Sequence, residues 1–253
     1  MLTQQISHQN KNKTEYTLEQ AQKLAYLGTM ATATAHELNQ PIGIIRAMTD
    51  AALSDLRSGL WSPTEVQPLL EKILAQTERL ARIIENLRAF ARSDRTKREQ
   101  VDLAKLVEQV GQMFVEQFKH RNIVLKIEFE HTGPTPIAWA NPVQLEEVLI
   151  NLLTNARDAV ESKPRPAVWM KCRRLKGGKS KIVVEDNGPG LSPEYRQKIF
   201  TPFVSTKTTE KGTGLGLFIS RRFVTDLGGR LYYEDRPGGG ARFVVELPPL
   251  KGA

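Results

Sequence analysis

Apolar residues in the first third of the chain recur at alternating steps of three and four, which is the spacing of one face of an α-helix. The first stripe predicts a long helix over residues 18–56 and consists of Leu24, Leu27, Ala31, Thr34, Leu38, Ile42, Ile45, Thr49, Ala52 and Leu56. The second predicts a helix over residues 64–92 and consists of Val66, Leu70, Ile73, Thr77, Leu80, Ile84, Leu87 and Ala91. Such regular spacing is typical of a coiled coil or a helical bundle.

A short turn separates the two predicted helices, because Ser58, Gly59, Ser62 and Pro63 interrupt the apolar pattern. Two helices joined in this way form an antiparallel hairpin, which alone has too small a core to be stable. Two hairpins related by a two-fold axis form a four-helix bundle that buries both stripes. We therefore expect a homodimer. The alternative is a hairpin that packs on the rest of its own chain.

The pattern changes after residue 92. Residues 93–100, SDRTKREQ, are polar and charged and indicate an interdomain linker. Helical spacing then covers 101–118, 141–160 and 214–228, and strand-like alternation covers 122–130, 167–175, 179–187, 230–235 and 241–247. This mixture predicts a layered α/β domain with helices on one face of a mixed sheet. The expected organisation is a lead-in (1–17), a helical hairpin (18–92), the linker (93–100), an α/β domain (101–248) and a tail (249–253).

Composition fits an ordinary globular protein, since 40% of the 253 residues are hydrophobic and 25% are charged. No apolar run is long enough to cross a bilayer, and no signal peptide opens the sequence. Cys172 is the single cysteine, which excludes an intramolecular disulfide and a cysteine-based zinc cluster. We expect a cytoplasmic location for this chain, which is compatible with membrane anchoring of a full-length parent. Cys172 is expected to be a packing residue in a strand.

The formal net charge is +8, and basic residues crowd between Arg157 and Lys181. Nucleic-acid binding must be considered for such a chain. However, the basic run has Trp169 as its only aromatic residue, and no DNA-reading motif is present. We expect no nucleic acid as a partner. A solvated basic face, or attraction to an acidic protein or a polyphosphate, explains the charge better.

His36 lies in the stretch AHELNQP, midway between the stripe residues Thr34 and Leu38. At about 100° per residue its side chain points away from the apolar face and into solvent. Glu37 is its neighbour, and Gln40 follows one helical turn later. A lone histidine on a helix is more often a surface or core residue than a reactive one. Its interpretation therefore depends on the second domain.

Two asparagines, Asn151 and Asn155, lie four residues apart in NLLTNARDA, so they share one helix face. The amide carbonyl is a neutral ligand that suits Mg²⁺ already largely neutralised by phosphates. The alternative is two polar residues on the exposed face of a helix.

Asp186 follows the apolar strand KIVVE and begins the stretch DNGPGL. A carboxylate at a strand end can accept a hydrogen bond from an exocyclic amine. Gly188 and Gly190 allow the backbone to turn sharply and to approach a flat ring. The alternative is a common strand-ending turn.

The stretch IFTPFVSTK contains Phe200 and Phe203 on either side of a proline, where two aromatic rings could anchor a lid. Core packing is the alternative. Lys207 lies beyond them and could reach a terminal phosphate as a mobile point charge.

Glycines open the last predicted helix in KGTGLGLFIS, at Gly212, Gly214 and Gly216. Backbone N–H groups at a helix N-terminus attract phosphate, and glycines permit close approach. The stretch is not a Walker P-loop, because no GK[ST] follows. It is not a Rossmann fingerprint either, because no strand leads directly into it and no third glycine has the required spacing.

The order of these motifs resembles the cytoplasmic core of a sensor histidine kinase from two-component signalling. AHELNQP is similar to the H-box, NLLTNARDA to the N-box, DNGPGL to the G1 box, IFTPF to the F-box and GTGLGL to the G2 box. The resemblance covers residues 20–248, and its wording is most similar to the dicarboxylate- and nitrogen-sensing subgroup. It implies an all-α hairpin, a four-helix bundle on dimerisation, followed by an α/β two-layer sandwich of the GHKL ATPase type.

The resemblance also implies roles for individual residues. His36 would take the γ-phosphoryl group of ATP, and Glu37 would act as a base or orient the ring. Gln40 stands where the family usually has Thr or Asn to position water for dephosphorylation of the response regulator, so phosphatase activity is left open. Asn155 would bind Mg²⁺ with support from Asn151, and Asp186 would read adenine. The other nucleotide-binding positions implied are Gly188, Gly190, Phe200, Phe203, Lys207, Gly212, Thr213, Gly214, Leu215 and Gly216. The implied partner is a response regulator receiver domain, which accepts the phosphoryl group on an aspartate.

Two other functions remain open. The gyrase, Hsp90 and MutL-like ATPases share the implied fold, and in those proteins a glutamate four residues before the Mg²⁺-binding Asn activates water. Here Asn151 holds that position, which argues against hydrolysis as the main reaction. A dimeric scaffold that keeps the motifs without activity is the third possibility.

Overall fold

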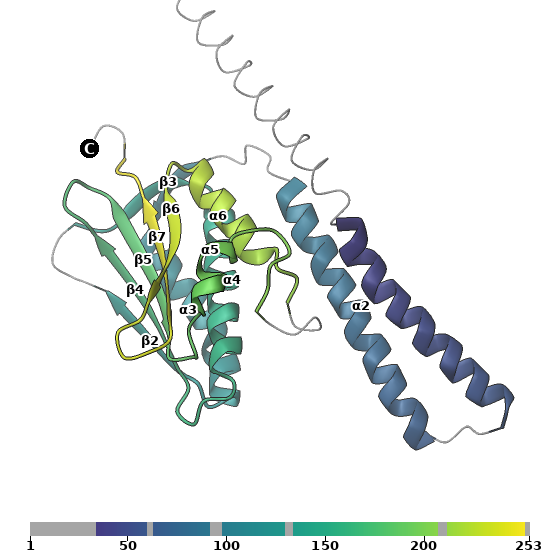
Figure 1. Cartoon of the computed structure of the whole chain (residues 1–253). Helices are drawn as coiled ribbons and strands as arrows, with labels where there is room; N and C mark the ends of the chain where they lie inside the picture. Colours follow the sequence, from purple (N-terminus) through teal and green to yellow (C-terminus); the bar gives the residue numbers. More distant parts are fainter. Residues whose placement is uncertain (1–33, 60–62, 92–97, 130–133, 207–211, 251–253) are drawn as a thin grey trace, which may run out of the picture. The chain divides into compact units, whose positions relative to one another are not determined.

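The computed structural model describes residues 34–59, 63–91, 98–129, 134–206 and 212–250. The chain forms two compact units, with the division between Ile83 and Ile84 (Figure 1). None of the helices in these described ranges is both long enough and apolar enough to span a membrane.

The first unit is a pair of helices. The first helix is described over residues 34–57, and α2 spans Pro63–Ala91. Gly59, with φ of 70°, follows the first helix and allows the backbone to leave it in the left-handed region. The part of the first predicted helix before residue 34 lies outside the described residues.

The apolar stripes of this hairpin serve two faces. On α2, the predicted stripe residues Leu70 and Ile84 are 57% and 47% exposed, whereas Ile83, which the predicted stripe left out, is fully buried. On the first helix, Ile42 and Leu56 are 50% and 55% exposed. The predicted stripes therefore coincide only in part with the seam between the two helices, and part of each remains uncovered in the single chain.

The second unit contains a five-stranded sheet with the order β2-β4-β5-β7-β6. The strands are β2 (Val124–Phe129), β4 (Ala167–Arg174), β5 (Ser180–Asp186), β6 (Arg230–Asp235) and β7 (Ala241–Leu247). β2 and β4 run parallel, and the other neighbours are antiparallel, so the prediction of a mixed sheet is confirmed.

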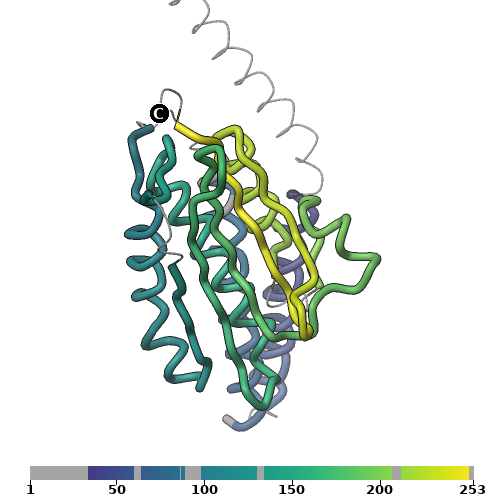
Figure 2. Tube along the Cα trace, turned by 90° about the vertical axis from the view of Figure 1, so that its left-hand side faces the viewer, coloured from purple at the N-terminus to yellow at the C-terminus, as the bar shows by residue number. Residues whose placement is uncertain are grey.

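Three helices cover one face of this sheet: α3 (Leu103–His120), α4 (Pro142–Val160) and α6 (Gly216–Asp226) (Figures 1 and 2). Asp102 and Asn141 cap α3 and α4 by accepting hydrogen bonds from backbone N–H groups of the first turn. Alternate residues of β4 enter the core, and Cys172 is 2% exposed among them. Burial raises the pKa of its thiol to about 12. The predicted α/β sandwich and the packing role of Cys172 are confirmed.

Three short elements differ from the sequence-based expectation. β1 (Glu99–Asp102) pairs antiparallel with β3 (Ile137–Ala140), and α5 (Pro193–Lys198) precedes the predicted aromatic loop. Assigning Glu99 and Gln100 to the linker was therefore wrong, because both belong to β1. Strands of four residues are too short to show a periodicity. Only their mutual pairing reveals them.

Candidate active site

The predicted asparagines are joined to α6 by a chain of hydrogen bonds. The side-chain amide of Asn151 donates to Oγ of Ser220 over 2.9 Å, and that of Asn155 donates to Oδ1 of Asn151 over 3.4 Å. Ser220 is 3% exposed, so the chain starts in the core. Because Asn151 uses both its amide nitrogen and its carbonyl oxygen within the protein, it supports Asn155. The half-buried Asn155 is the better placed of the two to bind a ligand.

Gly216, the first residue of α6, packs directly on this amide chain. A Cβ atom built at this position would overlap Oδ1 of Asn151. Within the described part of the chain, no side-chain hydrogen bond caps the N-terminus of α6, so its first N–H groups keep the capacity to bind an anion. The predicted asparagines and the predicted glycine helix therefore lie side by side.

Asp186 is fixed at the end of β5. Its Oδ1 accepts hydrogen bonds from the backbone N–H groups of Gly188 (2.8 Å) and Ala241 (3.3 Å). The carboxyl group is 2% exposed, and loss of hydration raises its pKa, although these two hydrogen bonds act in the opposite direction. Neither bond uses Oδ2, so this oxygen can accept a hydrogen bond from an amine.

Gly188 has little room for a side chain. A Cβ atom there would lie 2.7 Å from Oδ1 of Asp186 and 2.8 Å from the carbonyl oxygen of Ala159 on α4. The absence of a side chain lets the turn after β5 close against α4. Gly190 has φ of 73°, which favours glycine. Both predicted glycines therefore have a local structural reason.

The aromatic loop is hydrogen-bonded to the glycine segment and packs against it. Phe203 has φ of 63°, and its N–H donates to the carbonyl oxygen of Gly214 over 3.0 Å. A Cβ atom at Gly214 would overlap the backbone of Phe203. The guanidinium group of Arg221 lies 4.9 Å from the ring centre of Phe200. These contacts bring the two predicted motifs together.

Parts of the predicted lid fall outside the described residues, including Lys207. On the α6 side, Oγ1 of Thr213 accepts a hydrogen bond from the N–H of Leu215 over 3.4 Å. Leu215 is 1% exposed and anchors this end of the segment in the core. Gly212 is half-buried. The described part of the segment is thus held by Leu215.

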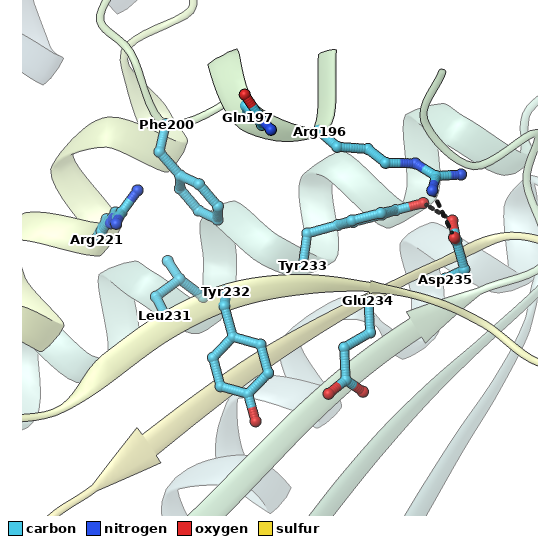
Figure 3. Close-up of a pocket in the computed structure, with 9 residues that line it drawn as sticks. All are labelled: Arg196, Gln197, Phe200, Arg221, Leu231, Tyr232, Tyr233, Glu234 and Asp235. Carbon is cyan, nitrogen blue, oxygen red and sulfur yellow. Dashed lines mark hydrogen bonds and ion pairs between the residues drawn. The ribbon is translucent and has the colours of Figure 1, made fainter. Parts of the chain in front are cut away.

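A hollow of about 450 Å³ lies elsewhere, between α5, α6 and the edge strand β6 (Figure 3). Its lining includes Arg196, Phe200, Arg221, Tyr233 and Asp235. An ion pair joins Arg196 to Asp235 over 2.9 Å, and the Tyr233 hydroxyl donates to the same carboxylate over 2.7 Å. Of the described residues, Phe200 is the only predicted site residue in its lining. This hollow is therefore not where the sequence motifs place a ligand.

In the first unit, His36 is exposed, as the helical spacing predicts. The amide nitrogen of Gln40 lies 3.2 Å from Nε2 of the imidazole. An amide nitrogen can only donate, so Nε2 accepts this hydrogen bond, and a neutral ring then carries its proton on Nδ1. Glu37 pairs with Arg79 of α2 over 2.8 Å. The imidazole is thus accessible to solvent and oriented by its helix.

Comparisons with known proteins match both units. Residues 26–96 match the family described as the His Kinase A (phospho-acceptor) domain, and residues 140–251 match the Histidine kinase-, DNA gyrase B-, and HSP90-like ATPase family. The catalytic domain of histidine kinase ThkA is 30% identical, with a TM-score of 0.54, over 60% of this chain and 96% of that one. The chain belongs to the sensor histidine kinase family.

Longer relatives show how much of a sensor histidine kinase is present. The C4-dicarboxylate transport sensor protein DctB of Rhizobium meliloti (strain 1021) is 36% identical over 91% of this chain and 36% of its own length. DctB of Pseudomonas aeruginosa is 37% identical over 92% and 37%, respectively. The structure of ThkA in complex with the response regulator TrrA aligns with 93% of this chain at a TM-score of 0.74 and 26% identity. This chain therefore spans just over a third of either DctB.

Sequence reasoning missed two side chains of this histidine kinase core. Ser220 anchors Asn151, and Arg79 holds Glu37. Ser220 gave no signal, because a serine inside an amphipathic helix is ordinary. Arg79 gave only a weak signal in the sequence: it is a charged residue directly beside Leu80, a member of the apolar stripe of α2.

Replacing Gly216 with Ala tests the contact between α6 and the asparagines. The new methyl group must displace Asn151 or α6, and such overpacking costs about 1–3 kcal/mol. We expect affinity for an ATP analogue, measured by calorimetry, to fall by about 5- to 100-fold if that cost falls on the bound state. Gly43→Ala is the control, because nothing lies within 4 Å of a Cβ atom there. Unchanged affinity in Gly216→Ala would show that this packing does not shape the site.

Proposed function

We propose that this chain transfers the γ-phosphoryl group of ATP to His36 and then to an aspartate of a response regulator receiver domain. The observation that carries the proposal is the exposed imidazole of His36 within the segment that matches the phospho-acceptor family. The match of residues 140–251 to the ATPase family supports ATP as the phosphoryl donor. A nucleotide site without an exposed acceptor would suit a simple ATPase instead.

The second unit offers groups that fit ATP with Mg²⁺. The buried carboxylate of Asp186 suits the exocyclic amine of adenine, and the uncapped N-terminus of α6 suits phosphate. Among the described residues, no cluster of three or more His, Cys, Asp or Glu side chains could hold a metal ion. A neutral amide oxygen from Asn155, together with phosphate oxygens, is therefore the ligand set that we propose for Mg²⁺. When bound, the ion would neutralise phosphate charge during transfer.

The chemical step needs an unprotonated ring nitrogen on His36. Its lone pair forms the N–P bond while the bond from phosphorus to the β-phosphate oxygen breaks and ADP leaves. The proton on the opposite ring nitrogen passes to the carboxylate of Glu37, which leaves a neutral imidazole ring bearing the negatively charged phosphoryl group. Because Gln40 donates to Nε2, this hydrogen bond must break if Nε2 is the attacking atom. Gln40 then becomes available to hold a water molecule near the phosphoryl group.

Simple ATP hydrolysis is the competing function for the same fold. Its water-activating glutamate is replaced by Asn151, and the Asn151 amide is bonded to Ser220 and Asn155. Incubation with γ-labelled ATP separates the two activities. We expect the label to accumulate on the protein, approaching one phosphoryl group per chain, with little free phosphate. Continuous release of phosphate, with no label taken up by the protein, would instead establish an ATPase activity.

We further propose that the chain forms a homodimer through the exposed apolar residues of the hairpin. Leu70, Leu74, Ile42 and Leu56 are each at least half exposed in the single chain. Burial of one such side chain contributes about 1.5–3 kcal/mol, and a two-fold interface uses each one twice. The dimer thus supplies the partner that the two-helix hairpin lacks.

Leu74→Lys is the corresponding test, because it places a charge on this uncovered face. We expect a dimer that survives at micromolar concentration in the unchanged protein to become a monomer, as measured by light scattering after size exclusion. Met113→Lys is the control, since Met113 is similarly exposed, at 58%, on α3 of the other unit. A Leu74→Lys protein that remains fully dimeric would place the interface elsewhere.

The relatives support proposals for the receiver partner and for the input signal. ThkA has been solved in complex with the response regulator TrrA, and we propose a receiver domain of that kind as the acceptor for this chain. Both DctB relatives are C4-dicarboxylate transport sensors, which supports the dicarboxylate-sensing subgroup. Transfer of label from the phosphorylated chain to a purified receiver domain tests the partner class.

A further inference from the structure

The seam between the two helices of the hairpin becomes polar beside His36. Gln76 and Arg79 of α2 are each 2% exposed, at positions where a helical hairpin ordinarily buries apolar side chains. Ile83, one turn beyond Arg79, is fully buried and restores the apolar seam. The polar interruption is therefore local.

Arg79 and Glu37 form an ion pair across this seam. The Nη2–H group of Arg79 donates to Oε2 of Glu37 over 2.8 Å, and the two side chains are 2% and 19% exposed. Among the described residues, Nε of Arg79 is buried without a hydrogen-bond partner. Glu37 follows His36 directly in the sequence, so a buried cation from the opposite helix fixes the carboxylate of the residue next to the acceptor in the chain.

A second pair lies one turn away. The helices are antiparallel and Glu37 faces Arg79, so Gln40, three residues later, faces Gln76, three residues earlier. Oε1 of Gln40 and Oε1 of Gln76 are both buried and lack a partner within the described part of the chain. Gln40 also contacts the His36 ring. Glu37, Gln40, Gln76 and Arg79 thus form a polar layer that extends from the seam to the imidazole.

Stability alone does not explain this polar layer. Buried ion pairs cost much of their attraction in lost hydration, and apolar residues of similar size often stabilise a protein as well or better. The buried amide oxygens without partners add a further cost. Such a layer is explained more readily by what it positions than by the stability it supplies.

We infer that Arg79 is a positioning residue for the phosphorylation of His36 and that it acts through Glu37. This inference rests on the proposed function. The guanidinium group holds the Glu37 carboxylate in one orientation, so that it can orient the imidazole and accept its proton during transfer. Because Arg79 belongs to α2, rotation of the first helix relative to α2 would separate the pair. The readiness of His36 therefore depends on the register of the two helices.

The test compares four variants of the full chain. Arg79→Met keeps the volume of the side chain and removes its charge, and Arg79→Lys keeps the charge. Glu37→Gln removes the carboxylate, and a double variant combines it with Arg79→Met. Arg82→Met is the matched control, because Arg82 is an exposed arginine one turn further along the same helix. For each protein we measure the initial rate of labelling by γ-labelled ATP, the affinity for an ATP analogue and helix content.

A misplaced catalytic group costs about 100-fold in rate, and we expect a loss of that order in Arg79→Met with ATP-analogue affinity and helix content unchanged. Arg79→Lys should label at least about tenfold faster than Arg79→Met, because it restores a cation. In the Glu37→Gln background, Arg79→Met should change the rate by less than about twofold, because independent effects add and shared ones do not.

Four results would overturn the inference. An Arg79→Met protein that labels at the rate of the unchanged chain removes the positioning role. A loss that adds in full to that of Glu37→Gln, or one that Arg79→Lys fails to relieve, shows a purely structural role. An unchanged chain that takes up no label overturns the proposed function as well, so the two failures are distinguishable.

Discussion

The His36→Gln chain is expected to take up no label from γ-labelled ATP, with a fall of at least about 10³-fold, as when a reacting side chain is removed from an enzyme. A glutamine amide has no nucleophilic lone pair on nitrogen, so the N–P bond cannot form. The side chain is exposed, and exposed substitutions usually change stability by less than about 0.5 kcal/mol. Loss of label would therefore report the chemistry and not the fold.

Two further measurements complete this first prediction. Affinity for an ATP analogue should be unchanged, because the proposed nucleotide site lies in the other unit. His120→Gln is the matched control, since His120 is an exposed histidine in the last turn of α3, and it should label normally. Stable labelling of the His36→Gln chain would mean that another residue accepts the phosphoryl group.

Asn155→Asp is expected to lower the labelling rate by about 100- to 1000-fold. Removal of one group that stabilises charge in the transition state typically costs an enzyme about this much in rate. The change adds a negative charge where the proposal places Mg²⁺ and phosphates. It also removes the amide group that donates to Oδ1 of Asn151, which leaves two oxygens facing each other. The metal–phosphate geometry and the support from Asn151 are thus altered together.

The rate for Asn155→Asp should be measured over a range of Mg²⁺ concentrations. Asn122→Asp, at an exposed turn position, provides the same chemical change away from the site. We expect this control to label at the normal rate. An Asn155→Asp chain that labels as fast as the control at every Mg²⁺ concentration would refute the ligand role of Asn155.

Much of the fold could be predicted from residue spacing. α4 spans Pro142–Val160 against an expectation of 141–160, and β4 spans Ala167–Arg174 against 167–175. Such elements are long enough to show their period, and each has one buried face. β1 and β3 were missed because each has four residues, and their stability comes from pairing with each other across the intervening α3 and β2.

The candidate site was predictable in its parts but not in its assembly. Sequence motifs indicated Asn151 and Gly216, yet only the structure shows the glycine lying directly on the amide. In the same way, Phe203 and Gly214 belong to different motifs and share one hydrogen bond. Contacts between distant segments depend on packing, which a single sequence does not contain.

Arg79 shows the same limit more sharply. Its distance from Glu37 along the chain is large, and the pairing follows from the register of two antiparallel helices. The exposed residues Leu70 and Leu74 show a related ambiguity, because apolar spacing alone does not separate a face that packs within the chain from one that packs on a second copy.

The most direct test of the central claim is the chemistry and location of the label itself. The chain is incubated with γ-labelled ATP, divided, and exposed to acid or to alkali before the label is mapped to a peptide. Phosphohistidine is labile in acid and stable in alkali, so we expect acid to remove the label and alkali to retain it on the peptide that contains His36. Label that survives acid, or that maps to any other peptide, would contradict the account.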